Sequence, residues 1–331
     1  MSLIAAITKF VDREIELSKL IEYADRGFYP ILYIYGPEGC GKTRLLQELV
    51  TRLYGRRDYY TIYVNALTLR GDIRDAIIGS RELIDIARHV ASGYSEPLGR
   101  LIALLLPRIM KAFVERYGIK NKHVVIAIDD IAKPLGLDTI ESYVKNLLDT
   151  LEYLLGIGAK SVFIIATTSE GLSRDIILRH SYAHIEAIWN LPREASIELL
   201  KQLKAPREKY DEIYRVTGGN PRAIIELYYM NWSIRRWIES AIMRRVKNFL
   251  KTLSREEIEQ LKDTLDDPDR FQRYTPLLKK TIDYNLVSPI DKPCLGYTPE
   301  KNIELGIGDN YAWQLPIYKD IIKQVILHKH T

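Results

Sequence analysis

The sequence contains little cysteine and no long apolar run, and each of these absences excludes a class of protein. Only 2 of its 331 residues are cysteine, Cys40 and Cys294, which is too few for a disulfide framework. Apolar runs such as Leu101–Leu106 and Val124–Ile128 have the length of core elements and fall short of the roughly 18–20 residues that cross a bilayer. The first residues, MSLIAAITKFVDRE, lack the basic start of a secretory signal. We therefore expect a reduced, cytoplasmic protein without a membrane partner.

A strong net charge is also absent. Hydrophobic residues make up 47% and charged residues 27% of the chain, which is typical of a globular protein, and the formal net charge is +5. That charge is too small to predict a nucleic-acid partner. Basic residues nevertheless gather around one acid, Glu239; they are Arg235, Arg236, Arg244, Arg245, Lys247 and Lys251. This cluster either attracts phosphate groups or forms a solvated helix face, and the sequence leaves both interpretations open.

Short apolar runs alternate with longer amphipathic stretches from Pro30 to about Ile188. The runs are rich in Ile, Val and Tyr and therefore read as strands; they are Ile31–Tyr35, Thr61–Val64, Val124–Ile128, Val162–Ala166 and His184–Ile188. Helical patterns lie between them. Alternation of hydrophobic strands with helices predicts an α/β fold, with a parallel sheet covered by helices on both faces.

Strands become rare after about residue 190. Three segments are predicted to be helical, Pro192–Leu203, Glu208–Val216 and Pro221–Leu250, which indicates a small helical module. We expect three domains: an α/β core over residues 1–190, a helical module over residues 191–252, and a further domain over residues 253–331.

The last predicted domain begins with a possible capping box, in which Ser254 and Glu257 would satisfy backbone groups at the start of a helix. A short helix after Pro268 and another after Pro276 follow. The stretch Val287–Ala312, punctuated by Gly and Pro, could hold a β-hairpin. Helix, short helix, helix and hairpin is the order of elements in a winged helix.

The most specific motif connects the first predicted strand to the first predicted helix after it. It fits G-x-x-x-x-G-K-[ST], and its residues are Gly36, Pro37, Glu38, Gly39, Cys40, Gly41, Lys42 and Thr43. Glycines allow successive backbone amides to surround a phosphate, and the helix start adds positive dipole character. Lys42 is then expected to reach the β- and γ-phosphates of a nucleotide and Thr43 to take a Mg²⁺ position. Cys40 stands at a variable position, so no redox role is expected for it.

A second motif ends the apolar run Val124–Ile128 with two carboxylates, Asp129 and Asp130. Strand ends of a parallel sheet face the ligand crevice. Asp129 is therefore expected to hold Mg²⁺ through its water shell and Asp130 to polarise the attacking water. A pair of aspartates after a strand can also be a simple turn.

These motifs and the order of the elements resemble the archaeal ATPases of the STAND branch, which are relatives of the AAA+ ATPases. The resemblance extends over nearly the whole chain, most specifically at the phosphate-binding motif and least in the C-terminal segment. It implies ATP rather than GTP as the nucleotide, Mg²⁺ as cofactor and ATP hydrolysis. It also places Arg44, which follows Thr43, among the nucleotide-binding residues.

Near the N-terminus, FVDREIEL resembles the F-x-x-R-E-x-E-L pattern of this family. The resemblance implies that Phe10, Val11 and Arg13 lie against the adenine and ribose. A capped amphipathic helix explains the same residues without a ligand.

Two further residues are assigned by resemblance on the stretch that follows the fourth predicted strand. Ser169, at the end of VFIIATTS, stands where relatives carry a polar residue that orients water, although a strand end is often polar. Arg179 stands where relatives place an arginine that reaches the nucleotide, with Arg174 close in sequence. A surface arginine is the alternative for either one.

The stretch Gly218-Gly219-Asn220-Pro221-Arg222 resembles the G-x-P signature of the family's helical lid. It implies that Pro221 packs near the adenine and that Arg222 senses the γ-phosphate. An ordinary N-cap followed by proline at the first helical position is the alternative. One departure stands out, because many relatives carry Glu where this chain has Asp130. The shorter reach to water predicts slow turnover and favours a switch over a fast motor.

From these observations we expect a Mg²⁺-dependent ATPase that works as a nucleotide-controlled conformational switch and binds ATP and ADP. Its partner would be another protein or a second copy of the chain. The alternative is an ATP-regulated protein that binds double-stranded DNA through a winged helix, with Lys279, Lys280 and Tyr284 on or near the recognition helix.

Overall fold

The computed structural model describes residues 8–168, 171–179, 181–290 and 293–327. The chain forms two compact units. The sheet unit comprises Arg13–Tyr35 and Lys42–Glu186, and the C-terminal unit comprises the residues before Arg13, the loop Gly36–Gly41 and the chain from Ala187 onward. The phosphate-binding motif therefore crosses the boundary between the two units at Gly41–Lys42. The predicted boundary between residues 252 and 253 stays a prediction.

A six-stranded sheet forms the centre of the sheet unit, with the order β3-β2-β4-β5-β1-β6. Its strands are β1 (Ile31–Tyr35), β2 (Tyr59–Asn65), β3 (Ile77–Ile78), β4 (His123–Asp129), β5 (Ser161–Thr167) and β6 (Ala183–Ala187). Neighbours β2 and β4, β4 and β5, and β5 and β1 run parallel, while β3 runs antiparallel to β2. The predicted α/β fold with a mostly parallel sheet is confirmed. The strand β3 was not predicted, because two residues at a sheet edge leave no alternation to detect.

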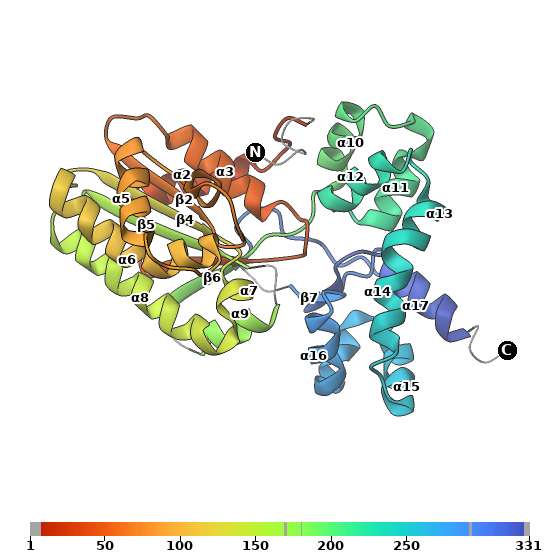
Figure 1. The fold of residues 1–331 in the computed structure, drawn as a ribbon. Helices are drawn as coiled ribbons and strands as arrows, with labels where there is room; N and C mark the ends of the chain where they lie inside the picture. The colour runs from red at the N-terminus through yellow and green to blue at the C-terminus, as the bar shows by residue number, and fades with distance from the viewer. Residues whose placement is uncertain (1–7, 169–170, 180, 291–292, 328–331) are drawn as a thin grey trace. The chain divides into compact units, whose positions relative to one another are not determined.

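Helices cover both faces of this sheet (Figure 1). They are α2 (Glu14–Arg26), α3 (Lys42–Leu53), α4 (Ile73–Ala76), α5 (Arg81–Ala91), α6 (Leu98–Tyr117), α7 (Ala132–Leu135), α8 (Leu137–Gly156) and α9 (Gly171–Ile177). Helices α2 and α3 contact β4 from one side, and α6 and α8 pack on the other face of the sheet. Full cover explains why the central strands are apolar at nearly every position.

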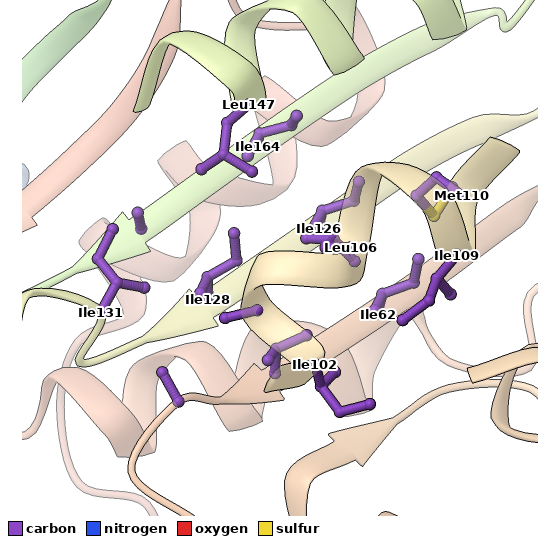
Figure 2. Close-up of a cluster of buried hydrophobic side chains, with 14 of the residues drawn as sticks. Ile62, Ile102, Leu106, Ile109, Met110, Ile126, Ile128, Ile131, Leu147 and Ile164 are labelled. Atoms are coloured by element: carbon purple, nitrogen blue, oxygen red, sulfur yellow. The ribbon is translucent and has the colours of Figure 1, made fainter. Parts of the chain in front are cut away.

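A large buried cluster lies between the sheet and the helices α6 and α8 (Figure 2). Strand residues on this face alternate with residues on the other, so that Ile126 and Ile128 of β4 pack here. Side chains of α6 meet them; they are Ile102, Leu106, Ile109 and Met110. The residue after Ile128 in the strand, Asp129, must then project to the opposite face, which is the face of α3.

The C-terminal unit is mostly helical. Its elements are α10 (Arg193–Gln202), η1 (Arg207–Lys209), α11 (Tyr210–Thr217), α12 (Pro221–Tyr229), α13 (Ile234–Trp237), a π-helix η2 (Ile238–Ile242), α14 (Met243–Leu250), α15 (Arg255–Thr264), η3 (Pro268–Arg273), α16 (Thr275–Asp283), β7 (Val287–Pro289), β8 (Tyr311–Trp313) and α17 (Ile317–Leu327). The segment Pro221–Leu250 is not one continuous helix. Asn231 and Trp232 have positive φ values, which interrupt it after α12.

The end of the chain follows the predicted order of elements. Ser254 and Glu257 form the expected capping box at the start of α15, and both reciprocal hydrogen bonds are present. A short 3-10 helix and α16 follow, and β7 pairs antiparallel with β8. The winged-helix assignment itself stays a prediction. None of the helices in the described residues is both long enough and apolar enough to cross a membrane.

Candidate functional site

The loop of the phosphate-binding motif requires glycine at three positions. Gly36, Gly39 and Gly41 have φ values of +154°, +83° and +105°, which other residues rarely adopt. Space is also limiting, since a Cβ at Gly36 would lie 2.1 Å from the Ile188 carbonyl oxygen and one at Gly39 would lie 2.5 Å from the Arg222 Cβ. Loops with this kind of backbone are suited to binding anions through their amides.

The helix α3 begins directly after this loop, with Lys42 as its first residue. Lys42 is buried and Thr43 is exposed. The first turn of α3 contains no acidic residue, so its positive dipole end is not neutralised by a carboxylate of its own. Leu45, Leu46 and Leu49 are buried and fix the helix against the sheet. The start of α3 is therefore suited to an anion.

Asp129 lies at the end of β4 and is 4% exposed. Its Oδ1 accepts a hydrogen bond from the Thr167 hydroxyl at 2.7 Å, and its Oδ2 accepts one from the Tyr63 hydroxyl at 3.0 Å. Thr43 is a further residue whose side chain favours the charged form of this carboxylate. Burial raises the pKa of Asp129, and the donors Thr167, Thr43 and Tyr63 oppose this by stabilising the charged form. A buried carboxylate with these donors is held in one orientation.

Strand register explains why these side chains meet. Parallel pairing aligns Asn65 with Asp129 and Ile128 with Ala166, so that Thr167 lies beside Asp129 on the neighbouring strand. Tyr63 stands two positions before Asn65 and therefore projects from the same face of the sheet. Sequence reasoning missed both Tyr63 and Thr167. A polar residue in the last positions of a strand beside the Asp129 strand is the signal that could have found them.

Asp130 leaves the sheet in the left-handed conformation, with a φ of +57°. Its backbone amide donates to the Thr167 hydroxyl oxygen at 3.1 Å. Thr167 thus links the two aspartates, because it accepts from the backbone of one and donates to the carboxylate of the other. The side chain of Asp130 is half-buried.

The residues assigned near the N-terminus fall in different units. Phe10 and Val11 are half-buried and belong to the C-terminal unit. Arg13 belongs to the sheet unit, has a φ of +73° and forms a buried ion pair with Glu16 at 2.8 Å. Arg13 is also the N-cap residue of α2, without a side-chain capping bond. The capped-helix interpretation is therefore met only in part: Arg13 is the N-cap residue, but its side chain pairs with Glu16 and makes no capping hydrogen bond.

The assignments after β5 have different outcomes. Ser169 lies outside the described residues. Arg179 is exposed in the turn after α9. Arg174 is buried, with its guanidinium 5.0 Å from the centre of the Tyr35 ring and paired with Asp175 at 2.8 Å. Of the two arginines, only Arg179 is placed at the surface.

The predicted lid signature lies in the C-terminal unit together with the loop Gly36–Gly41. Asn220 caps α12 by accepting the amide of Ala223 at 3.1 Å, and Pro221 is the first residue of that helix. The same Asn220 side chain donates to the carbonyl of Glu38 at 2.9 Å. Arg222 pairs with the Glu38 carboxylate at 2.6 Å. The stretch is thus an N-cap and also a direct contact of the phosphate-binding loop.

The residues expected on a DNA-recognition helix are mostly engaged within the protein. Lys280 pairs with Glu257 at 2.6 Å, and the Tyr284 ring lies 5.5 Å from that of Phe249. Lys279 is exposed. One of the three side chains is therefore placed for an external partner.

Comparison with known proteins identifies the family. The profile of an ATPase domain found predominantly in Archaea matches residues 10–227, which include both aspartates and the whole phosphate-binding motif. The chain belongs to this family. An uncharacterized ATP-binding protein of Methanocaldococcus jannaschii is 22% identical over 308 residues, covering 79% of this chain and 80% of the relative. Another from Pyrococcus horikoshii is 24% identical over 293 residues, covering 76% of this chain and 86% of the relative.

Solved structures of AAA+ proteins are similar over most of the chain. Cdc6p from Pyrobaculum aerophilum has a TM-score of 0.42 at 14% identity and covers 98% of this chain and 96% of its own. AMPPCP-bound DnaA from Aquifex aeolicus has a TM-score of 0.40 at 16% identity and covers 98% of this chain and 94% of its own. Both scores are below 0.5, so the fold assignment rests on the elements of this chain.

Proposed function

We propose that this protein binds ATP with Mg²⁺, hydrolyses it, and acts as a nucleotide-controlled conformational switch. The observation that carries the proposal is the presence of two features within an archaeal ATPase family: a glycine-dependent phosphate-binding motif, and a buried aspartate at a strand end whose charged form is favoured by Thr43 of that motif. Thr43 and Asp129 both belong to the sheet unit, and a hydroxyl and a carboxylate of this kind are the groups that hold Mg²⁺ in nucleotide-binding proteins of this type.

The residues fit ATP and Mg²⁺. The loop amides and Lys42 would bind the phosphates, with Arg44 beside them, and Thr43 and Asp129 would hold the metal partly through water. Thr167 and Tyr63 already orient both oxygens of Asp129, so the carboxylate needs no rearrangement of its neighbours to serve as a metal ligand. Bound Mg²⁺ would neutralise charge on the phosphates during transfer.

Catalysis of phosphoryl transfer depends mostly on position and charge. Asp130 would orient the attacking water, and Arg222, Ser169 and Arg179 are the further groups assigned to the phosphates and the water. Phe10, Val11, Arg13 and Pro221 would contact the base and ribose. The shorter side chain of Asp130 supports slow hydrolysis, which suits a protein whose output is a change of state.

Phosphate release tests the proposal. The wild type should release phosphate from ATP in Mg²⁺ buffer, Lys42→Ala should lose nucleotide binding, and Asp130→Asn should bind ATP while hydrolysis falls by about 100-fold or more, as expected for loss of a group that positions or activates the nucleophile. Calorimetric titration of each protein with ATP separates binding from turnover. Equal phosphate release by all three proteins would refute the enzymatic part of the proposal.

A switch requires that ATP and ADP stabilise different states of the chain. Analytical ultracentrifugation and limited proteolysis with each nucleotide test this. A protein partner or a second copy is the expected recipient of the change. Identical sedimentation and identical proteolytic patterns with ATP and ADP would refute the switch and leave a simple ATPase.

A second candidate function, ATP-regulated binding of double-stranded DNA, is favoured by one observation. Arg244, Lys247 and Lys251 are exposed at spacings of three and four residues, which places them on one face of the helix α14 and its end. Fluorescence anisotropy with duplex DNA, with and without ATP, tests this candidate. Binding that fails to weaken as salt rises would argue against phosphate contacts by these residues.

A further inference from the structure

Glu38 stands at a variable position of the phosphate-binding motif, yet its backbone and side chain are both held by the C-terminal unit. Its amide donates to the Gln314 side-chain oxygen at 2.9 Å, and its carbonyl accepts from Asn220 at 2.9 Å. Its carboxylate pairs with Arg222 at 2.6 Å through Oε1 and with Arg245 at 3.0 Å through Oε2. Four residues from three segments, the start of α12, α14 and the stretch before α17, thus contact one loop residue.

The carboxylate of Glu38 is charged at neutral pH. Burial alone would raise the pKa of Glu38, but the attraction of Arg245 and Arg222 outweighs burial and lowers it. Arg245 is in turn fixed by the hydroxyl of Tyr318 at 2.9 Å, and Tyr318 is buried in α17. The two guanidinium groups therefore share one carboxylate and carry one positive charge more than it neutralises.

The backbone of Arg222 contacts the phosphate-binding loop directly. Its amide donates to the Gly39 carbonyl at 3.3 Å, and the space beside Gly39 is so limited that a Cβ there would overlap the Cβ of Arg222. A guanidinium next to an anion-binding loop pairs as readily with phosphate as with carboxylate, because both present two oxygens to its two N–H groups. The Glu38 carboxylate therefore forms an ion pair with Arg222, an arginine that phosphate groups bound at the loop would also attract.

We propose that Glu38 is an internal competitor for Arg222, which phosphate groups displace when a nucleoside triphosphate binds the loop. This inference rests on the proposed nucleotide site. A triphosphate carries more charge than a diphosphate and displaces Glu38 more completely, so Glu38 is a specificity-determining residue for the triphosphate state. Because Glu38 also pairs with Arg245, its displacement changes the contacts of α14 and, through Tyr318, of α17.

A double-mutant cycle tests the competition. Wild type, Glu38→Gln, Arg222→Met and the double variant are titrated calorimetrically with a non-hydrolysable ATP analogue in Mg²⁺ buffer. Glu38→Gln should bind the analogue at least about fivefold more tightly than wild type, the lower end of usual coupling between sites. Glu38→Gln should give no gain in the Arg222→Met background, because the released partner is missing.

A matched control uses a carboxylate that does not touch the loop. Glu239 pairs with Arg235 at 3.0 Å within the same unit, so Glu239→Gln removes one negative charge and one ion pair without altering the loop. Its affinity for the analogue should equal that of wild type. Glu38→Asp, which keeps the charge but is too short to reach both arginines, should lie between wild type and Glu38→Gln and replaces the latter if Glu38→Gln does not fold.

Hydrogen exchange gives a readout independent of affinity. The analogue should change exchange at Asn220–Ala223 and Gln314–Tyr318 in wild type and change it much less in Glu38→Gln, whose loop no longer holds the arginines. Equal affinities of wild type and Glu38→Gln would overturn the inference. An equal gain in both Arg222 backgrounds would also overturn it, because it would indicate simple repulsion. A wild type and Lys42→Ala that both fail to bind the analogue would instead overturn the proposed function.

Discussion

Thr167→Val is the sharpest perturbation of the proposed metal site. Valine has the shape of threonine but lacks the hydroxyl that donates to Asp129 at 2.7 Å and accepts the Asp130 amide at 3.1 Å. Thr167 is 1% exposed, so water cannot replace these bonds. Leaving a buried polar group unsatisfied costs about 1–3 kcal/mol, and more for a charged group. The two lost bonds predict a fall of about 2–4 kcal/mol in the free energy of unfolding.

Thr150→Val is the matched control in the same unit. Thr150 is 5% exposed, and its hydroxyl donates to the Asn146 carbonyl within α8 at 2.8 Å. Asn146 is positioned four residues earlier in the same helix, so its carbonyl keeps a helical hydrogen bond when the hydroxyl is lost. Urea unfolding should therefore show a fall below about 1 kcal/mol for the control.

The pH dependence gives a second signature. Asp129 has a raised pKa in the folded protein, and the Thr167 hydrogen bond opposes that rise by favouring the charged carboxylate. In Thr167→Val the folded-state pKa of Asp129 rises further, because the charged carboxylate loses a hydrogen bond. The substitution therefore lowers the free energy of unfolding little when Asp129 is protonated and most when it is charged. The stability difference from wild type should be smallest at acidic pH and grow as pH rises through the titration of Asp129. A difference that is independent of pH, or no larger than that of Thr150→Val, would refute the proposed role of Thr167.

Three further predictions use other parts of the chain. Leu106→Ala, in the core between α6 and the sheet (Figure 2), should lower the free energy of unfolding by about 2–5 kcal/mol in urea titration, and a loss below about 1 kcal/mol would mean that this core is poorly packed. Ser254→Ala should remove the capping bond to the Glu257 amide and lower stability by about 0.5–2 kcal/mol, whereas Ser254→Asp should preserve it. Glu38→Gln should be less stable than wild type at neutral pH, because the lowered pKa of Glu38 means that its carboxylate stabilises the folded state above the unfolded value near 4.5; the difference should shrink as pH falls below that value, and an unchanged difference there would contradict the ion pairs.

Five of the six strands in the sheet, and the motif that follows the first of them, were predicted from the sequence. Each run Ile31–Tyr35, Val124–Ile128 and Val162–Ala166 falls within an observed strand, since buried parallel strands are apolar at every position and stand out along the chain. The glycines of the motif can also be interpreted from the sequence alone. Their positive φ values require a residue without a Cβ, and this property follows from the residue type at that single position.

The interruption of the predicted helix Pro221–Leu250 is a feature that the local sequence pattern does not predict. Met230–Ser233 contains no proline or glycine, and its apolar spacing continues that of a helix, yet Asn231 and Trp232 adopt positive φ and Trp232 is buried. Packing of α12 and the following helices within the C-terminal unit decides this turn. Helix propensity is too weak a preference to resist it.

The amino-acid sequence by itself determined the α/β class, the phosphate-binding loop and the aspartate at the strand end, because each depends on residues that are neighbours in the chain. Only the tertiary structure decided which side chains surround them. Tyr63 and Thr167 reach Asp129 through strand pairing, and Arg245 reaches Glu38 from more than two hundred positions away in the chain. Hydrogen bonds and ion pairs act over a few ångströms of space, whatever the separation along the chain, and therefore require the fold to be known.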